Sequence, residues 1–285
     1  MKNNSTSTLR TFSLADNISV IIRPSVVVGM IYIALITFVA LLNHYSAYDF
    51  MHVGTVWSEH NPAGTWGYDG QYYYQMARNL LGAYQYMDNA PFREQHIFYA
   101  LVVGALSLGQ AALIPYMLLF VNVCSVILSV ELLARLLSKH GLSPWFSLAL
   151  GLYFGQAAGI LFDTAEPFTY FLVMSGIWFA MEKKPVALSA ILFGLAALTR
   201  EIAILFPIAY ICVAFVRRQW STLIQYVVLG ILPLVALLIS LRLIFGQTGV
   251  TFTRPFEHIP FADVFYYINT PKKFYLILLL MFLPT

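Results

Sequence analysis

The chain has 285 residues, of which 60% are hydrophobic and 10% are charged, with a formal net charge of +3. A soluble domain carries about 25% charged residues, so the composition excludes an ordinary soluble enzyme and indicates a membrane protein. We expect an all-α polytopic bundle of about eight transmembrane helices. It should form a single domain over residues 1–285.

The first apolar run, 25–43, has no charged residue and no small-residue cleavage site, so we interpret it as a retained span. Further apolar runs follow at 96–108, 112–137, 144–162, 167–181, 185–199, 202–216, 221–245 and 273–285. At about 1.5 Å of rise per residue, the run 96–108 is too short to cross a bilayer. We expect it to form a juxtamembrane or re-entrant helix.

Basic residues predict the orientation of these spans. They cluster at Lys2/Arg10/Arg23, Arg135/Lys139, Lys183/Lys184 and Arg217/Arg218. The positive-inside rule places these clusters, and therefore the N-terminus, on the cytoplasmic side. Residues 44–95 then form a first outer loop and residues 246–272 a second. The polar turns at 163–167 and 199–201 face the same outer side.

The first outer loop contains the stretch Gly67-Tyr68-Asp69-Gly70-Gln71-Tyr72-Tyr73-Tyr74. The apolar side chains after it recur at helical spacing, so residues 70–84 predict a helix that lies on the outer leaflet. Asp69 precedes this helix. Its carboxylate is either an N-cap or a general base at the membrane surface, and the local pattern does not separate the two.

Two acidic residues, Asp163 and Glu166, flank the turn before Pro167. Glu166 would complement the dipole of the following helix. Alternatively, Asp163 and Glu166 bind a sugar or a divalent cation such as Mg²⁺ or Mn²⁺.

Arg200 and Glu201 lie between two short apolar runs, where ionisable residues are usually paired or functional. They form either a structural ion pair or a site in which Arg200 binds the phosphate of a lipid carrier and Glu201 orients it. In the second outer loop, Arg254 and His258 are either solvated or contact the phosphate or the acceptor.

Three motifs resemble a known superfamily: Tyr68-Asp69-Gly70-Gln71 before two aromatic residues, Met87-Asp88-Asn89-Ala90-Pro91-Phe92-Arg93, and Leu198-Thr199-Arg200-Glu201. Together they resemble the polyprenyl-phosphate-dependent glycosyltransferases of the GT-C fold, notably bacterial membrane proteins of cell-surface glycopolymers. The second motif departs from the pattern at Ala90 and after Arg93. Members of the family usually have more helices, so we expect the chain to be short at its C-terminus.

The resemblance implies an inverting transfer of a sugar from a polyprenyl-phosphate donor to a glycan, lipid or protein acceptor at the outer face of a bacterial inner membrane. It implies that Asp69 is the base and that Arg200 stabilises the leaving phosphate. Further substrate contacts would come from Tyr68, Gln71, Asp88, Arg93, Asp163, Glu166, Glu201, Arg254 and His258.

Two other hypotheses stay open. The chain is alternatively a non-catalytic membrane subunit of a glycopolymer assembly system, or a transporter of lipid-linked glycans with Glu131 and Asp163 as relay groups. A transporter usually carries an internal repeat, and none is evident. Nothing in the sequence resembles a nucleotide-binding loop, and no nucleic-acid partner is expected.

Overall fold

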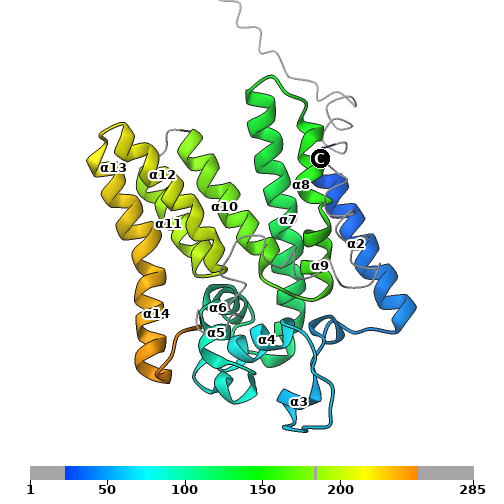
Figure 1. The fold of residues 1–285 in the computed structure, drawn as a ribbon. Coiled ribbons are helices and arrows are strands. Elements are labelled where there is room, and N and C mark those ends of the chain that lie inside the picture. Colours follow the sequence, from blue (N-terminus) through cyan, green and yellow to red (C-terminus); the bar gives the residue numbers. More distant parts are fainter. Residues whose placement is uncertain (1–22, 183–184, 250–285) are drawn as a thin grey trace, which may run out of the picture.

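The computed structural model describes residues 23–182 and 185–249 (Figure 1). This part of the chain is helical and contains no strand, which confirms the predicted all-α class. The predictions for Arg254, His258 and the run 273–285 lie outside the described residues.

Three of the described helices are long and apolar enough to cross a membrane, which indicates a membrane protein. They are α2 (Pro24–Asn43), the helix Ala111–Lys139 that contains α7 (Ile114–Lys139), and the helix Trp220–Phe245. The last combines α13 (Trp220–Gln225), a π-helical segment (Tyr226–Ile231) and α14 (Leu232–Phe245). Large apolar side chains on α2 and α14 are exposed, as expected for surfaces that face lipid.

The remaining helices are shorter. They are α3 (Thr55–Ser58), α4 (Gly70–Arg78), α5 (Ala90–Glu94), α6 (Ile97–Leu106), α8 (Leu148–Gly151), α9 (Phe154–Leu161), α10 (Glu166–Met181), α11 (Val186–Ala197) and α12 (Leu205–Val216). Single 3₁₀ segments lie at Asp49–Met51, Leu80–Tyr86, Ala111–Leu113, Pro144–Ser147 and Glu201–Ile204. The short α6 agrees with the prediction that its apolar run does not span.

The run 144–162 differs from the prediction of one continuous span. It folds as a 3₁₀ turn followed by α8 and α9, with a break after Leu152. The Tyr32 hydroxyl of α2 donates a 2.7 Å hydrogen bond to the carbonyl oxygen of Gly151. The Gly151 carbonyl group has no intrahelical hydrogen bond at the helix end, and the distant Tyr32 side chain supplies one. The break therefore leaves no unpaired carbonyl group at this position among apolar neighbours.

The helix predicted over residues 70–84 is also interrupted. It ends at Arg78, and Asn79 takes an extended backbone before the 3₁₀ segment Leu80–Tyr86. α4 packs against α6 and α7, and both Tyr73 and Met76 are buried in the main core. The amphipathic face of α4 is therefore covered by protein.

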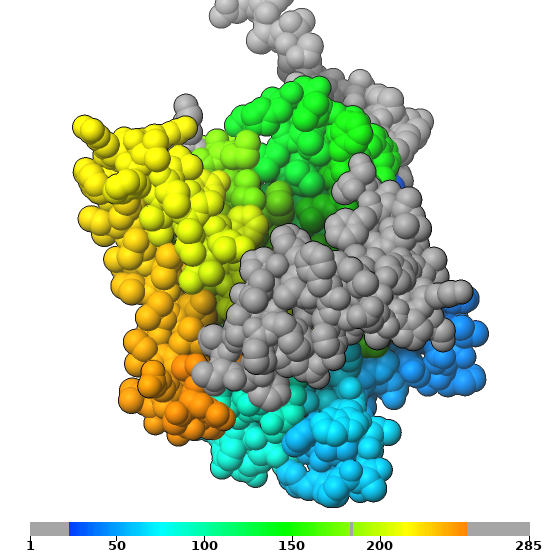
Figure 2. All heavy atoms as spheres, viewed as in Figure 1, coloured from blue at the N-terminus to red at the C-terminus, as the bar shows by residue number. Residues whose placement is uncertain are grey.

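The main core lies among α4, α6, α7, α10 and α11, and a smaller one joins α2 to α7 and α9. α7 is central, since it contacts α2, α6 and α10, and α11 packs between α10 and the π-helical segment. The first loop forms one end of the molecule, beside the end of α14 (Figure 2). Tyr84 and Phe245 are in ring contact there, with centroids 6.4 Å apart.

The other end of the bundle carries the described basic residues that predicted the cytoplasmic side (Figure 1). Arg23 and Arg135 both bond to Glu131 at the ends of α2 and α7. Lys139 pairs with Glu182 across 2.5 Å, which joins the end of α7 to the end of α10. Basic clusters and polar motifs thus lie at opposite ends, as the sequence predicted.

Candidate functional site

Asp69 is held at the start of α4 by the fold of the preceding loop. Gly67 has a φ of 73°, which favours glycine, and it lies one residue before Tyr68. The Gln71 amide accepts a hydrogen bond from Gly54 N (3.0 Å) and donates one to Trp66 O (2.9 Å). Gln71 is buried, so the structure gives it a role in holding the loop rather than the substrate contact expected from the motif.

The side chain of Asp69 does not cap α4, although Asp69 occupies the N-cap position. Its Oδ1 instead accepts a 2.9 Å hydrogen bond from Arg93 Nη1 of α5. Asp69 Oδ2 makes no hydrogen bond to any of the described residues. The capping interpretation is therefore replaced by an ion pair that fixes one carboxylate oxygen of a side chain that is 27% exposed.

Arg93 connects two carboxylates. Its Nε and Nη2 each donate a 2.8 Å bond to Asp88, and its guanidinium lies 4.4 Å from the centre of the Tyr72 ring. Burial alone would lower the pKa of Arg93, but Asp88 and Asp69 raise it above the usual arginine value. Arg93 and Asp88 are therefore positioned to orient Asp69, a different role from the direct substrate contact that the resemblance implied.

The acidic turn after α9 is packed directly against the start of α4. A Cβ added at Gly70 would lie 2.5 Å from the carbonyl oxygen of Phe162, so only glycine permits this approach. The rings of Tyr68 and Phe162 are also in contact, with centroids 4.7 Å apart. These contacts bring the turn that carries Asp163 and Glu166 to the first loop.

Arg200 pairs with Glu166 across the space between α11 and α10. Glu201 does not orient Arg200, contrary to the prediction, because it pairs with His96 at the start of α6. Adjacent residues point in different directions at the start of a helical segment. Glu166 takes the orienting role that the sequence assigned to Glu201.

A cavity of about 310 Å³ opens beside this ion pair. Its polar part contains Glu166, Arg200 and Glu201. The rest of the lining is largely apolar and comes from α10, the 3₁₀ segment after Arg200 and α12: Thr169, Tyr170, Val173, Ile202, Ala203 and Phe206. The cavity thus has a charged side and an apolar side.

The charges of both ion pairs act on the Tyr68 hydroxyl. Burial raises the pKa of Tyr68, and the carboxylates of Asp69 and Glu166 raise it further. The guanidinium groups of Arg200 and Arg93 act in the opposite direction. The Asp69–Arg93 and Glu166–Arg200 pairs therefore lie within electrostatic reach of one side chain, which gathers the three sequence motifs at one place.

Asp163 is not part of this cavity. It is fully buried with a φ of 48°, and neither carboxylate oxygen has a hydrogen-bond partner in the described part of the chain. Burial raises its pKa well above the usual range. Residues 23–182 and 185–249 contain no group of three potential metal ligands, and Glu166 is bound to Arg200, so these two carboxylates do not fit the divalent cation considered for them.

His96 and Tyr72 join the site without having been predicted. His96 is buried and holds Glu201, and Tyr72 stacks on Arg93. The sequence position of His96 could have predicted its role. An ionisable side chain at the edge of an apolar run is costly to bury unless it has a partner.

Comparison with known proteins adds no relative. No protein-family model, no curated protein and no solved structure matches the chain.

Proposed function

We propose that the chain is a membrane glycosyltransferase that moves a sugar from a polyprenyl-phosphate donor to a hydroxyl group of a glycan, lipid or protein acceptor. The observation that carries this proposal is the cavity beside Arg200, which has charged residues on one side and apolar residues on the other, with Asp69 within electrostatic reach of Arg200. The reaction would occur at the outer face of a bacterial inner membrane, with the N-terminus cytoplasmic. The position of the basic residues at the opposite end of the bundle supports this orientation.

A lipid phosphate matches the two parts of the cavity. The Arg200–Glu166 bond uses the Nη2 group, and a guanidinium has five N–H donors in a planar fork, so donors remain for phosphate oxygens. Val173 and Phe206 offer an apolar surface to the first isoprene units. The cavity volume of about 310 Å³ is at the lower end of the usual range for small ligands, about 300–1,000 Å³, which suits the head of a lipid whose tail lies outside.

The chemistry requires one base and one cation. Asp69 Oδ2 accepts the proton of the acceptor hydroxyl while the hydroxyl oxygen forms a bond to the anomeric carbon of the donor sugar. The bond between that carbon and the phosphate oxygen breaks, and the phosphate leaves with the electron pair. Arg200 stabilises the charge on the leaving phosphate. Because the new bond forms on the face opposite the leaving group, the anomeric configuration inverts.

Arg93 acts in this scheme through Asp69. By holding Oδ1 at 2.9 Å, it fixes the direction in which Oδ2 points and restricts rotation of the carboxylate. Asp88 in turn fixes Arg93 through two bonds. Asp88 and Arg93 are thus positioning residues.

An in vitro transfer assay tests the proposal. The full chain, reconstituted in lipid vesicles, is given polyprenyl-phosphate sugars and a panel of hydroxyl acceptors. We expect transfer by the wild-type chain and loss of transfer in Asp69→Asn and Arg200→Gln. Arg78→Gln is the matched control, because Arg78 is an exposed cation at the far end of α4. Full activity in Asp69→Asn would reject Asp69 as the catalytic base, and absence of transfer by the wild-type chain would favour a non-catalytic subunit.

One observation favours a transporter as the second candidate. Asp163 is a fully buried carboxyl group without a partner in the described residues, and such groups in membrane proteins often relay protons. In that case Asp163→Asn would abolish movement of a lipid-linked sugar across a vesicle membrane. The glycosyltransferase proposal instead predicts that transport is absent in the wild-type chain as well.

A further inference from the structure

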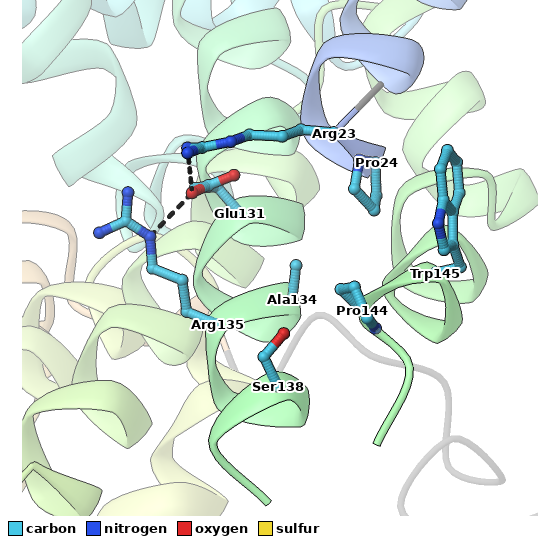
Figure 3. A pocket seen from close by; sticks show the side chains of 8 residues that line it. All are labelled: Arg23, Pro24, Glu131, Ala134, Arg135, Ser138, Pro144 and Trp145. Carbon is cyan, nitrogen blue, oxygen red and sulfur yellow. Dashed lines mark hydrogen bonds and ion pairs between the residues drawn. The ribbon is translucent and has the colours of Figure 1, made fainter. Parts of the chain in front are cut away.

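A second cavity lies at the opposite end of the bundle from Asp69. Its volume is about 610 Å³, and it is lined by residues at the start of α2, in α7 and in the 3₁₀ turn after α7: Arg23, Pro24, Glu131, Ala134, Arg135, Ser138, Pro144 and Trp145 (Figure 3). The glycosyltransferase mechanism uses none of these residues, so the cavity needs a separate explanation.

The polar side of this cavity has an excess of positive charge. Arg23 Nη1 and Arg135 Nε both contact Oε1 of Glu131, at 3.5 and 2.8 Å. Ser25 donates a 2.7 Å hydrogen bond to Oε2. The one carboxylate is thus satisfied by three donors, whereas each guanidinium uses a single N–H group in these bonds. The side chains of Arg23 and Arg135 are 51% and 57% exposed, so their other donors are available to an anion.

The opposite side of the cavity is apolar and aromatic. Pro144 and Trp145 lie across from the two arginines (Figure 3). Tryptophan favours the headgroup layer, because its ring is apolar and its N–H group is polar. The cavity also lies between α2 and α7, two helices that can cross a membrane. Its position and its lining both correspond to the boundary between headgroups and hydrocarbon.

We propose that this cavity binds the headgroup of an anionic phospholipid. The phosphate contacts the free N–H groups of Arg23 and Arg135, and the glycerol backbone lies against Trp145. From the cavity, the exposed side chains of Val26, Met30 and Ile33 continue along α2 at helical spacing. This apolar stripe accommodates an acyl chain, which a soluble phosphate ester lacks. The bound lipid would hold α2 against α7 and fix the depth of the bundle in the bilayer.

Native mass spectrometry of the full chain tests this inference. The protein is exchanged into detergent with phosphatidylglycerol or phosphatidylcholine of matched acyl chains, and retained lipid is counted. We expect preferential retention of phosphatidylglycerol. Arg135→Gln should weaken that retention about fivefold, since one arginine near an anionic lipid is worth about 1 kcal/mol. Ser138→Phe should weaken it by filling the cavity without changing the charge.

Two matched controls separate a specific site from general attraction. Arg218→Gln removes an exposed cation at the same end of the bundle, and Ser221→Phe adds the same ring at an exposed position outside the cavity. Both should retain phosphatidylglycerol as the wild type does. The inference is wrong if Arg218→Gln lowers retention as much as Arg135→Gln, or if both lipids are retained equally. Competition by soluble glycerol phosphate at the same concentration would identify a phosphate-ester site instead of a lipid site.

Discussion

Arg93→Gln should destabilise the protein, because it leaves Asp69 and Asp88 as neighbouring carboxylates without their shared counter-ion. Breaking a buried ion pair costs about 3–5 kcal/mol, whereas an exposed pair contributes about 0.2–1 kcal/mol. The side chains of Arg93, Asp88 and Asp69 are 15%, 20% and 27% exposed. Arg93→Gln should therefore lower the free energy of unfolding by an amount between these limits, about 2–3 kcal/mol.

The assay is thermal unfolding of the purified chain in detergent, followed by tryptophan fluorescence. A decrease of about 2–3 kcal/mol in the free energy of unfolding lowers the Tm by about 4–12 °C for a chain of this length. Arg78→Gln, which removes an exposed cation from the same region, is the control and should leave the Tm nearly unchanged. Adding Asp88→Asn to Arg93→Gln should recover part of the loss, because the two residues are directly bonded.

The pH dependence gives a second readout of the same variant. Burial would raise the pKa of Asp88, but the hydrogen bond and charge of Arg93 lower it below the usual value. The stabilisation is therefore present above the unfolded pKa of about 4 and is lost as the pH falls through the folded value. The Tm difference between wild type and Arg93→Gln should shrink in acid. A Tm equal to that of Arg78→Gln at neutral pH, or a difference that persists in acid, would refute the reasoning.

Three further changes have defined outcomes. Burial raises the pKa of Glu94 from its usual 4.5 to about 7. The contribution of Glu94 to stability is therefore present below the unfolded pKa and is lost as the pH rises through 7. Glu94→Gln should raise the Tm more at alkaline than at mildly acidic pH, and an equal gain at both pH values would contradict the predicted pKa shift. Gly70→Ala places a Cβ 2.5 Å from the Phe162 carbonyl oxygen, and should lower both the Tm and the transfer rate; unchanged values would show that the close approach is unimportant. Arg200→Lys keeps the charge but loses the planar fork that contacts Glu166. It should reduce transfer about 10- to 150-fold, since a hydrogen bond to a charged group is worth about 1.5–3 kcal/mol. Wild-type rates would argue against phosphate binding by the fork.

The sequence predicted the long helices well, because their signal is continuous over many residues. The run 25–43 differs by one residue from α2, and the run 112–137 lies within the helix Ala111–Lys139. The break inside 144–162 was not predictable from composition. At the break, the carbonyl oxygen of Gly151 accepts a hydrogen bond from the Tyr32 hydroxyl of another helix, a tertiary contact that composition does not reveal.

The sequence also predicted which polar motifs share one end of the bundle, since charge placement fixes the direction of each helix. It did not predict the pairing within that end. Glu166 and not Glu201 holds Arg200, and Arg93 bonds to the base candidate Asp69. These pairings depend on how α5, α10 and α11 pack, which spacing along the chain does not encode.

The most direct test of Asp69 as the catalytic base compares the sugar-transfer rates of the variants Asp69→Asn and Asp49→Asn. Asp49 is an exposed acid in the same loop whose carboxylate bonds only to Ser46 in the described structure. With a polyprenyl-phosphate donor, Asp69→Asn should reduce the rate by about 10²–10⁴-fold, the usual contribution of a general base, while Asp49→Asn should match the wild type. Equal rates for both variants would contradict the assignment of Asp69 as the catalytic base.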